Sequence, residues 1–473
     1  MIFNSIEFLV FFVIVLGAYW IMSRKAQNWF LLVASYVFYG AWDYRFLSLI
    51  LLSTFVDYYI GNKVYAAEAS SKRKQLLAVS VVVNLVILGF FKYFNFFAGS
   101  LQDLVGLFGF ELSTFSLTIV LPVGISFYTF QTMSYTIDIY KGKLEPSRDF
   151  FDFALFVAFF PQLVAGPIER AINLLPQVYA KRRFDLDQFG GGCYLILWGL
   201  FKKVVIADNL AVTVDQIFAK SEGFYSGEVL VGVLYFAFQI YCDFSGYSDI
   251  ARGVAKTLGF ELMVNFNLPY IARNPSDFWL RWHISLSSWL RDYLYIPLGG
   301  NRHGNLMTYR NLILTMLLGG LWHGAAWNFV VWGLFHGLIL AGHRKYTEIR
   351  EKFFGPVKKK ATWYGIAISV TVMFVFTLYG WLLFRAHTFA QIWEMTVNFV
   401  PLGFDPPFFN ALAKLVVYVS VLVLVQIGQI YTKNLEFIVE RPVALQSAFY
   451  LACFYLLVVF GAFNGTSFIY FQF

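Results

Sequence analysis

The sequence has few charged residues for its length. Asp, Glu, Lys and Arg make up only 14% of 473 residues, whereas soluble domains contain roughly 25%. So small a charged fraction cannot cover the water-facing surface of a soluble chain, and the same composition excludes disorder and a coiled coil. Hydrophobic residues account for 59% and aromatic residues for 21%. The composition therefore predicts a polytopic membrane protein.

Cysteine is scarce as well. Cys193, Cys242 and Cys453 lie far apart in apolar surroundings and form no CxxC pair. A disulfide scaffold is thereby excluded, and we interpret the three thiols as small buried side chains. HExxH and HxxxH spacings, a GxSxG elbow, a Walker A loop and a GxGxxG motif are also absent. We therefore predict neither a protein-built metal site nor a bound cofactor.

The net charge is +8, from 36 basic and 28 acidic residues. The basic residues sit between apolar runs rather than along one stripe, which argues against a nucleic-acid partner. The basic stretches 63–74 and 344–360 are predicted to be cytoplasmic, which places both termini outside. The first apolar run ends in Arg24 and Lys25 without a small-residue cleavage site, so we interpret it as an uncleaved anchor.

Apolar runs predict about twelve membrane crossings, since a span needs about 20 apolar residues. We therefore expect an all-α membrane domain covering residues 1–473. The runs lie at 8–23, 26–42, 75–91, 112–137, 153–168, 229–242, 312–342, 361–384, 415–432 and 442–473, with weaker ones at 46–62 and 188–207.

Residues 243–311 are unusually polar for this chain, yet rich in aromatic residues, proline and glycine. We interpret them as short interfacial or re-entrant helices packed inside the protein, because irregular backbone at membrane depth must be covered. One helix start is predicted at Asn274, with Pro275 in the first turn. Asp277 and Arg281 are spaced to form an ion pair one turn apart.

The run 312–342 would be about 46 Å long as one helix, which exceeds a hydrocarbon core of about 30 Å. Gly319, Gly320 and Gly324 bracket His323. A broken or tilted helix is therefore predicted, with His323 at the break.

His323 is the strongest candidate for chemistry, since an ionisable group deep in a span is costly. The alternative is a neutral histidine bonded to a carbonyl in the helix break. Histidine suits acyl transfer, because its pKa near 6.5 lets it take a proton from a hydroxyl and return one to a thiolate. This role requires that reactants reach the imidazole from both sides of the membrane.

The other histidines point less clearly to function. His283 alone is typical of a capping or network residue, and His336 and His343 are interpreted as structural. His303 and His387 are predicted in loops or at interfaces.

Three polar features leave two interpretations open. Asp243 and Asp249 follow an apolar run and belong either to an ion-pair network or to a wet cavity. Gln131, near the end of another run, is similarly ambiguous. The aromatic tail up to Phe473 is an ordinary interfacial belt, or Tyr470 carries an acyl group. A phenol pKa near 10 makes an aryl ester a more activated donor than an alkyl ester.

Five motifs together resemble the membrane-bound O-acyltransferases, specifically the bacterial alginate O-acetyltransferase branch, over roughly residues 3–470. The motifs are PVGISFYTFQ at 122–131, FPQLVAGPI at 160–168, DFSGYSD at 243–249, DFWLRWHISLS at 277–287 and GLWHG at 320–324.

The resemblance implies a many-helix fold in which funnels from both faces meet near the catalytic histidine. It assigns catalysis to His323, with His283 as the second family histidine, within a catalytic region at 243–342. The residues 464–473 look like an extracytoplasmic tail, with Tyr470 as an acyl relay. The expected substrate channel is lined by residues in or next to the motifs: Asp243, Ser245, Tyr247, Asp277, Arg281, Trp282, Ser287, Trp322, Asn328 and Gln131.

The resemblance also implies a multi-pass protein of the bacterial inner membrane, in contact with lipid. Acetyl-CoA, or another acyl thioester on CoA or a carrier protein, is the expected donor, and a periplasmic SGNH-type acetyltransferase the expected partner. The acceptor is an exported polysaccharide. The alternatives are transfer of D-alanine or another acyl group to an envelope polymer or lipid, and a non-catalytic transporter.

Overall fold

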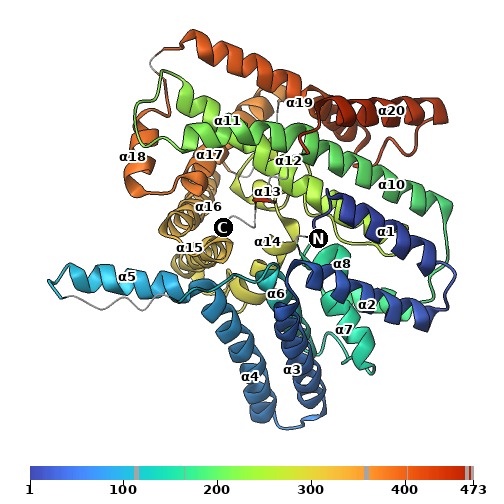
Figure 1. Ribbon diagram of the computed structural model, residues 1–473. Helices are drawn as coiled ribbons and strands as arrows, with labels where there is room; N and C mark the ends of the chain where they lie inside the picture. Colours follow the sequence, from blue (N-terminus) through green and yellow to red (C-terminus); the bar gives the residue numbers. More distant parts are fainter. Residues whose placement is uncertain (111–116, 165, 356–361, 402, 464–467, 470–473) are drawn as a thin grey trace. The chain divides into compact units, whose positions relative to one another are not determined.

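The computed structural model describes residues 1–473 except 111–116, 165, 356–361, 402, 464–467 and 470–473. Every regular element in this described part is helical, as Figure 1 shows, which confirms the predicted all-α class. The chain forms two compact units, Met1–Cys193 with Ala251–Met263, and Tyr194–Ile250 with Val264–Phe473. The single membrane-embedded domain expected over the whole chain stays a prediction.

The described part of the first unit begins with the following helices in chain order. They are α1 (Ile6–Tyr19), α2 (Arg24–Asp43), η1 (Tyr44–Phe46), α3 (Leu47–Ala66), α4 (Ser70–Leu88), η2 (Gly89–Tyr93), α5 (Phe94–Gly106), α6 (Ile125–Tyr140), α7 (Phe150–Ala158) and α8 (Phe160–Leu163). Then α9 (Ala171–Tyr179) leads into α10 (Leu186–Leu200), which continues into the second unit.

The second unit carries the remaining helices, and α12 reaches from it into the first unit. They are η3 (Phe201–Ala207), α11 (Asp208–Phe218), α12 (Glu228–Thr257), η4 (Pro269–Ile271), α13 (Pro275–Trp279), α14 (Ile284–Leu290), η5 (Arg291–Tyr295), α15 (Gly304–His323), α16 (Trp327–Phe354), α17 (Trp363–Arg385), α18 (Phe389–Val397), α19 (Pro406–Thr432) and α20 (Val443–Phe460).

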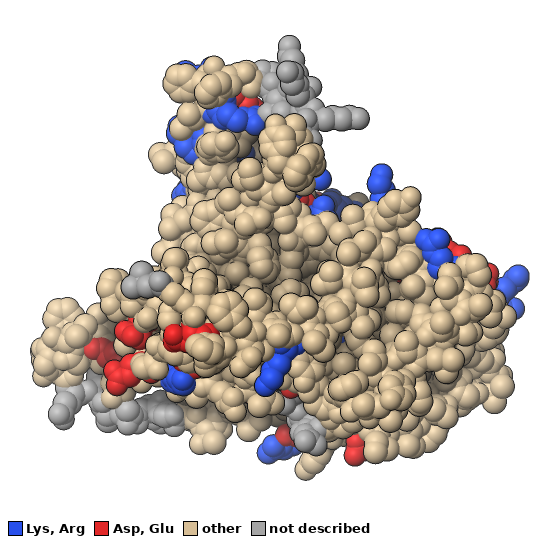
Figure 2. Space-filling view, turned by 90° about the horizontal axis from the view of Figure 1, so that it is seen from above, with Lys and Arg blue, Asp and Glu red and all other residues tan. Residues whose placement is uncertain are grey.

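Five helical stretches of the described part are long and apolar enough to cross a membrane, judged by length and composition. They are Ser70–Gly106, Glu228–Thr257, Trp363–Arg385, Pro406–Thr432 and Val443–Phe460. Large apolar side chains such as Leu451, Phe454 and Val458 on α20 are exposed, as lipid contact requires. Figure 2 shows a face on which charged side chains form only small groups. A multi-pass membrane protein is thus supported, while the number of about twelve crossings stays a prediction.

Two of the apolar runs that were predicted to span the membrane do not form continuous helices. Residues 117–124 are not helical, and α6 starts at Ile125 after Gly124, whose φ is +77°. A Cβ at Gly124 would lie 2.6 Å from the carbonyl oxygen of Leu163, so this approach of the two segments requires glycine. The run 153–168 divides at Phe159 into α7 and α8, because Pro161 lacks an N–H and fits only a first helical turn.

The predicted break in the run 312–342 is confirmed. The helix α15 ends at His323 and α16 begins at Trp327, and the two lie side by side in Figure 1. Their backbones touch through glycines: a Cβ at Gly320 would lie 2.2 Å from the Phe329 carbonyl oxygen, and one at Gly333 would lie 2.3 Å from that of Met316. This contact fixes where the chain turns after His323.

The helix α12 extends further than the sequence predicted. Residues 243–257, expected in a re-entrant segment, continue α12 as regular helix to Thr257. The carboxylates on this stretch are tolerated because η3 supplies lysines to them: Lys203 pairs with Asp243 at 2.7 Å, and Lys202 with Asp249 at 2.7 Å. The predicted start of α13 is confirmed, with Asn274 accepting a bond from the N–H of Asp277 at 2.9 Å.

A test of the α15–α16 contact uses two glycines of the same helix. We expect Gly333→Ala to lower the stability of the protein by about 1–3 kcal/mol, because the new methyl group meets a backbone carbonyl that cannot move away. Gly342→Ala is the matched control, since nothing lies within 4 Å of its Cβ position. Thermal unfolding in detergent measures both, and equal midpoints for the two variants would contradict the close contact.

Candidate active site

The two histidines of the recognised motifs come together in the second unit. His323 is the last residue of α15, and His283 directly precedes α14. Their ring centroids lie 6.3 Å apart with the planes tilted by 60°. His283 is 0% exposed and His323 is 3% exposed. A substrate therefore reaches these rings only when neighbouring side chains move.

Asn265 holds the ring of His283 in place. The Asn265 Oδ1 atom lies 3.2 Å from His283 Nδ1 and also accepts bonds from the N–H and hydroxyl of Ser285, at 3.2 and 2.9 Å. Since an amide oxygen can only accept, this contact places the proton on Nδ1 and makes Nε2 the basic nitrogen.

His283 itself has a strained backbone. Its φ is +43°, in the left-handed region that residues other than glycine rarely adopt. Such strain persists where the surroundings determine the conformation, often at functional sites. Here the strained residue connects α13 to α14 and turns the imidazole toward α15.

Aromatic rings surround both imidazoles. The ring of His323 lies 5.2 Å from Trp322, 5.0 Å from Trp332 and 5.5 Å from Phe384, measured between centroids. The ring of His283 lies 4.7 Å from Phe244 on α12. His336, interpreted as structural, contacts Trp332 at 4.6 Å and thus belongs to the same cluster. Such a dry setting strengthens electrostatic interactions at the imidazoles.

A buried network of charges lies next to this cluster. Lys203 sits between two carboxylates, 2.8 Å from Asp208 and 2.7 Å from Asp243. The neighbouring Lys202 pairs with Asp249 and donates to the hydroxyl of Ser245 at 3.0 Å. Both lysines lie in η3, a π-helical turn whose seven residues are all buried. Such turns recur at functional sites.

Close helix packing brings the network together. A Cβ at Gly199 would lie 2.5 Å from the carbonyl oxygen of Gly246, and a Cβ at Gly246 would lie 2.8 Å from that of Gly199. The two glycines therefore let α10 and α12 approach closely. Gly199 lies on α10 just before the lysines of η3, and Gly246 lies on α12 between Asp243 and Asp249. The ion-pair interpretation of Asp243 and Asp249 is confirmed.

The C-terminal segment docks on this part of α12. The amide N–H of Ile469 donates to Asp243 Oδ2 at 2.7 Å. The Phe468 ring lies 4.6 Å from Tyr247 and 5.6 Å from Phe244, the residue that also contacts His283. Both tail residues are 2% exposed. Tyr470 lies outside the described residues.

The other predicted channel residues have mainly local partners. Asp277 and Arg281 form the predicted ion pair at 2.7 Å. The hydroxyl of Ser287 donates to backbone carbonyls, including that of His283 at 2.9 Å, and Asn328 donates to the Phe384 carbonyl at 3.0 Å.

Trp282 and Gln131 complete the predicted set. Trp282 is fully buried and lies 4.7 Å from Trp381. Gln131 belongs to the first unit, where its amide donates to the Phe156 carbonyl at 2.7 Å. For all of these residues a role in the substrate channel stays a prediction.

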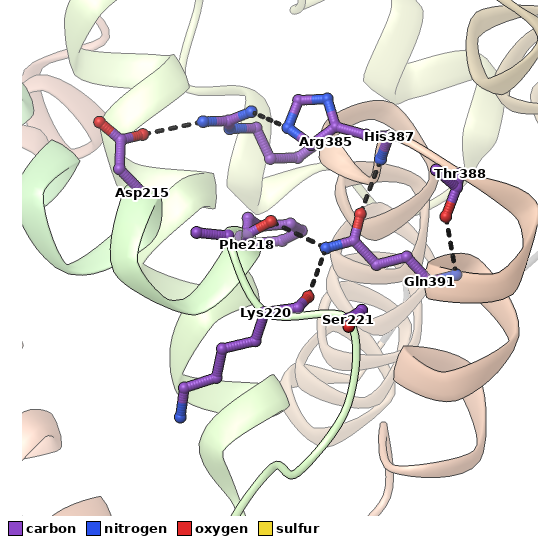
Figure 3. A pocket seen from close by; sticks show the side chains of 9 residues that line it. Asp215, Phe218, Lys220, Ser221, Arg385, His387, Thr388 and Gln391 are labelled. Atoms are coloured by element: carbon purple, nitrogen blue, oxygen red, sulfur yellow. Dashed lines mark hydrogen bonds and ion pairs between the residues drawn. The ribbon is translucent and has the colours of Figure 1, made fainter.

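A pocket of about 410 Å³ lies between the ends of α11 and α17 and the start of α18 (Figure 3). Arg385 pairs with Asp215 at 2.8 Å and donates to His387 Nε2 at 3.0 Å. Burial and the adjacent Arg385 lower the pKa of His387, which favours the neutral acceptor seen here. Gln391 donates to the carbonyls of Phe218 and Lys220 and so ties α18 to α11.

Sequence reasoning missed Asn265, Lys202 and Lys203 as parts of the site. The lysines were visible as two adjacent charges inside the weakly apolar run 188–207, which already indicated buried partners. Asn265 carried no comparable signal, because a single asparagine in a polar stretch is unremarkable. Among the described residues no group of three or more His, Cys, Asp or Glu side chains is arranged to hold a metal ion.

Comparisons with known proteins match the part of the chain that contains this site to one family. Residues 75–384 match the model of the MBOAT, membrane-bound O-acyltransferase family. The chain is 45% identical over 399 residues to a probable alginate O-acetylase of Azotobacter vinelandii, covering 84% of this chain and 77% of the relative.

Two further relatives extend the range of named activities. A peptidoglycan O-acetyltransferase of Helicobacter pylori is 38% identical over 417 residues, covering 81% of this chain and 77% of its own. A teichoic acid D-alanyltransferase of Streptococcus thermophilus is 31% identical over 252 residues, covering 50% of this chain and 60% of its own. The motifs at 243–249, 277–287 and 320–324 all lie inside the family match.

The anchoring of His283 can be tested through stability. We expect Asn265→Leu to lower the thermal midpoint by several degrees, because it leaves buried donors of His283 and Ser285 without their acceptor. Asn267→Ala is the matched control, since Asn267 is exposed two residues further along. Unfolding followed by tryptophan fluorescence in detergent measures both variants. An unchanged midpoint for Asn265→Leu would mean that the three bonds do not stabilise the site.

Proposed function

Since this chain belongs to the membrane-bound O-acyltransferase family, we propose that it moves an acetyl group from cytoplasmic acetyl-CoA across the membrane for O-acetylation of an extracytoplasmic polysaccharide. The chain is an acyltransferase. Acetyl rather than D-alanyl transfer is supported by 45% identity over 84% of the chain to the alginate O-acetylase, against 31% over 50% to the D-alanyltransferase.

His323 acts as the general base in this proposal. It takes the proton of the attacking hydroxyl while the new C–O bond forms at the thioester carbonyl. The C–S bond then breaks, and the imidazolium returns the proton to the leaving thiolate. His283, 6.3 Å away between ring centroids, orients the substrate in this proposal. The aromatic surroundings exclude water, which would otherwise hydrolyse the thioester.

Tyr470 is the first acceptor in this scheme. The observation that carries the proposal is the docked tail: Phe468 and Ile469 are buried against α12, where Phe244 contacts both Phe468 and His283. The next residue of the chain is Tyr470. Its aryl ester would be activated for transfer to a sugar hydroxyl, because phenol has a pKa near 10. An SGNH-type partner outside the membrane would take the acetyl group from it.

The proposed direction of transfer is supported by the basic end of the α15–α16 hairpin. Asn305 and Tyr309 near the start of α15 contact Glu348, within the basic stretch 344–360. We assign this end to the cytoplasm of a bacterial inner membrane, where basic residues attract the CoA phosphates. His323, at the other end of the 20-residue helix α15, is then about 30 Å along the helix from this end.

The first test concerns the catalytic base. We expect His323→Gln to reduce acetyl transfer at least a hundredfold, because an amide cannot take up the proton of the hydroxyl. His303→Gln is the control, since His303 is exposed in a loop and should leave the rate unchanged. Transfer from radiolabelled acetyl-CoA in proteoliposomes measures both. Near-normal transfer by folded His323→Gln protein would remove the proposed role.

The second test concerns the relay. After incubation with acetyl-CoA, we expect the C-terminal peptide to gain the mass of one acetyl group, located on Tyr470 by fragmentation. Tyr470→Phe keeps the ring and removes the hydroxyl, so its peptide should stay unmodified. If wild-type protein transfers acetyl groups to polysaccharide while its C-terminal peptide never carries one, even transiently in quenched reactions, the relay is wrong.

A further inference from the structure

The pocket at the ends of α11 and α17 lies outside the histidine cluster (Figure 3). Its volume of about 410 Å³ falls within the range of roughly 300–1,000 Å³ that small-molecule sites have. Basic, acidic and hydroxyl side chains line it together with one aromatic ring, that of Phe218. The acyl transfer described above uses none of these side chains, so their arrangement calls for a ligand of its own.

Internal bonds hold the walls of this pocket in place. The Gln391 amide donates to two carbonyls at the end of α11, both at 2.8 Å, and its Oε1 atom accepts the N–H of His387 at 2.8 Å. The Arg385 guanidinium is bonded to both Asp215 and His387. It also lies over the Phe218 ring, 5.8 Å from the centroid. Walls that are already ordered lose little entropy when a ligand binds.

Several groups of the lining keep hydrogen-bonding capacity for a ligand. Arg385 uses two of its five N–H donors in the contacts above. Lys220 uses one of three, to Glu228 at 2.5 Å. Within the part of the chain that the structure describes, the Ser221 hydroxyl has no partner and the second oxygen of Asp215 accepts no bond. The pocket therefore offers two cations, one carboxylate and one hydroxyl to the same ligand.

A sugar that carries a carboxylate matches this set of groups. Its carboxylate accepts charge-assisted bonds from Arg385 and Lys220, which are stronger than bonds between neutral groups. Its hydroxyl groups donate to Asp215 and exchange a bond with Ser221. Inorganic phosphate would place negative charge against Asp215, and an apolar ligand would leave the buried part of these polar groups without partners.

Ring contacts connect the pocket to the histidine pair. Phe218 in the pocket wall lies 6.0 Å from Phe236, measured between centroids. Phe236 lies 6.4 Å from Phe384, which in turn lies 5.5 Å from His323. Only two rings thus stand between the wall of the pocket and the proposed catalytic base.

The pocket lies at the end of α17 that is remote from the basic stretch 344–360. The helix begins at Trp363, soon after this stretch, and ends at Arg385 in the pocket. Its 23 residues rise about 34 Å, which exceeds a hydrocarbon core of about 30 Å. The two ends of α17 therefore reach opposite sides of a membrane.

We propose that this pocket binds a carboxylate-bearing sugar unit of the acceptor polysaccharide and holds the polymer beside the site of acyl transfer. Arg385 and Lys220 bind the carboxylate, while Asp215 and Ser221 bind hydroxyl groups. The inference rests on the proposed function, which assigns the basic end of the helices to the cytoplasm and the acceptor to the other side. Holding the polymer there raises its concentration where the acetyl group emerges.

Ala219→Trp and Gln216→Trp form a matched pair of variants without a change of charge. Ala219 is exposed and lines the pocket, so an indole at this position fills part of it. Gln216 is exposed on α11 outside the lining, so the same ring there leaves the pocket open.

Lys220→Gln and Lys414→Gln form a second pair, in which each change removes one positive charge. Lys220 lines the pocket, and a glutamine there still donates to Glu228. Lys414 is exposed on α19, outside the lining. This pair tests the proposal even if Ala219→Trp fails to fold.

The first measurement is equilibrium binding of three hexasaccharides to the full-length protein in nanodiscs of uncharged lipid. The probes are a hexauronate, a muramyl glycan without peptide, and cellohexaose. The first two carry carboxylates and distinguish two sources of the same chemistry, whereas the third is neutral. We expect one acidic probe to bind the wild type at least tenfold more tightly than cellohexaose.

The variants locate this binding. Ala219→Trp should weaken it at least tenfold and Lys220→Gln at least threefold, whereas Gln216→Trp and Lys414→Gln should match the wild type. Equal affinity for acidic and neutral probes would overturn the recognition of a carboxylate, and unchanged binding by folded Ala219→Trp and Lys220→Gln proteins would overturn the pocket. Binding of none of the probes would overturn the proposal. A fall in polymer acetylation in Ala219→Trp cells would then point to a protein partner.

The second measurement compares O-acetylation of the polymer in cells with release of CoA from acetyl-CoA by the purified protein. We expect Ala219→Trp to lower polymer acetylation at least fivefold and to leave CoA release unchanged. An equal fall of both quantities would show a structural effect and overturn the inference. A wild-type protein that never releases CoA would instead defeat the proposed function, while the binding measurement still decides the role of the pocket.

Discussion

The site depends on how the protein accommodates two adjacent lysines in an apolar interior. A buried ammonium is tolerated only with close partners, and Lys202 and Lys203 find them on α12, in Asp249 and Asp243. The pairing requires the glycine-to-glycine contact of α10 and α12. It also explains why α12 can remain helical through an acidic stretch that would otherwise have to leave the interior.

Next to this network, the two histidines lie at the ends of helices rather than in the middle of them. His323 closes α15, and His283 stands in a strained turn before α14. Helix ends leave backbone groups without helical partners, so both positions combine polarity with precise orientation. The aromatic rings that fill the remaining space keep the imidazoles dry, which suits an acyl donor that water would hydrolyse.

The features predicted correctly from the sequence are local ones. Composition indicated membrane helices, run length and glycines indicated the break at His323, and Asn274 with Pro275 indicated the start of α13. The errors at 112–137 and 153–168 arose because hydropathy ignores backbone geometry. It does not register that Pro161 fits only the first turn of a helix, nor that Gly124 packs against the distant Leu163. The early end predicted for α12 came from the polar composition of residues 243–311, whereas the partners of its carboxylates lie some forty residues earlier on η3.

The sequence alone determined that the chain is an all-α membrane protein, that its motifs match the acyltransferases, and that His323 lies at a helix break. Each of these follows from composition or from residues close together in the chain. Only the tertiary structure decided that His283 lies 6.3 Å from His323, that Asn265 sets its tautomer, and that Ile469 bonds to Asp243 across 226 residues. Such contacts depend on helix packing, because no local pattern specifies which distant segment a buried polar group will meet.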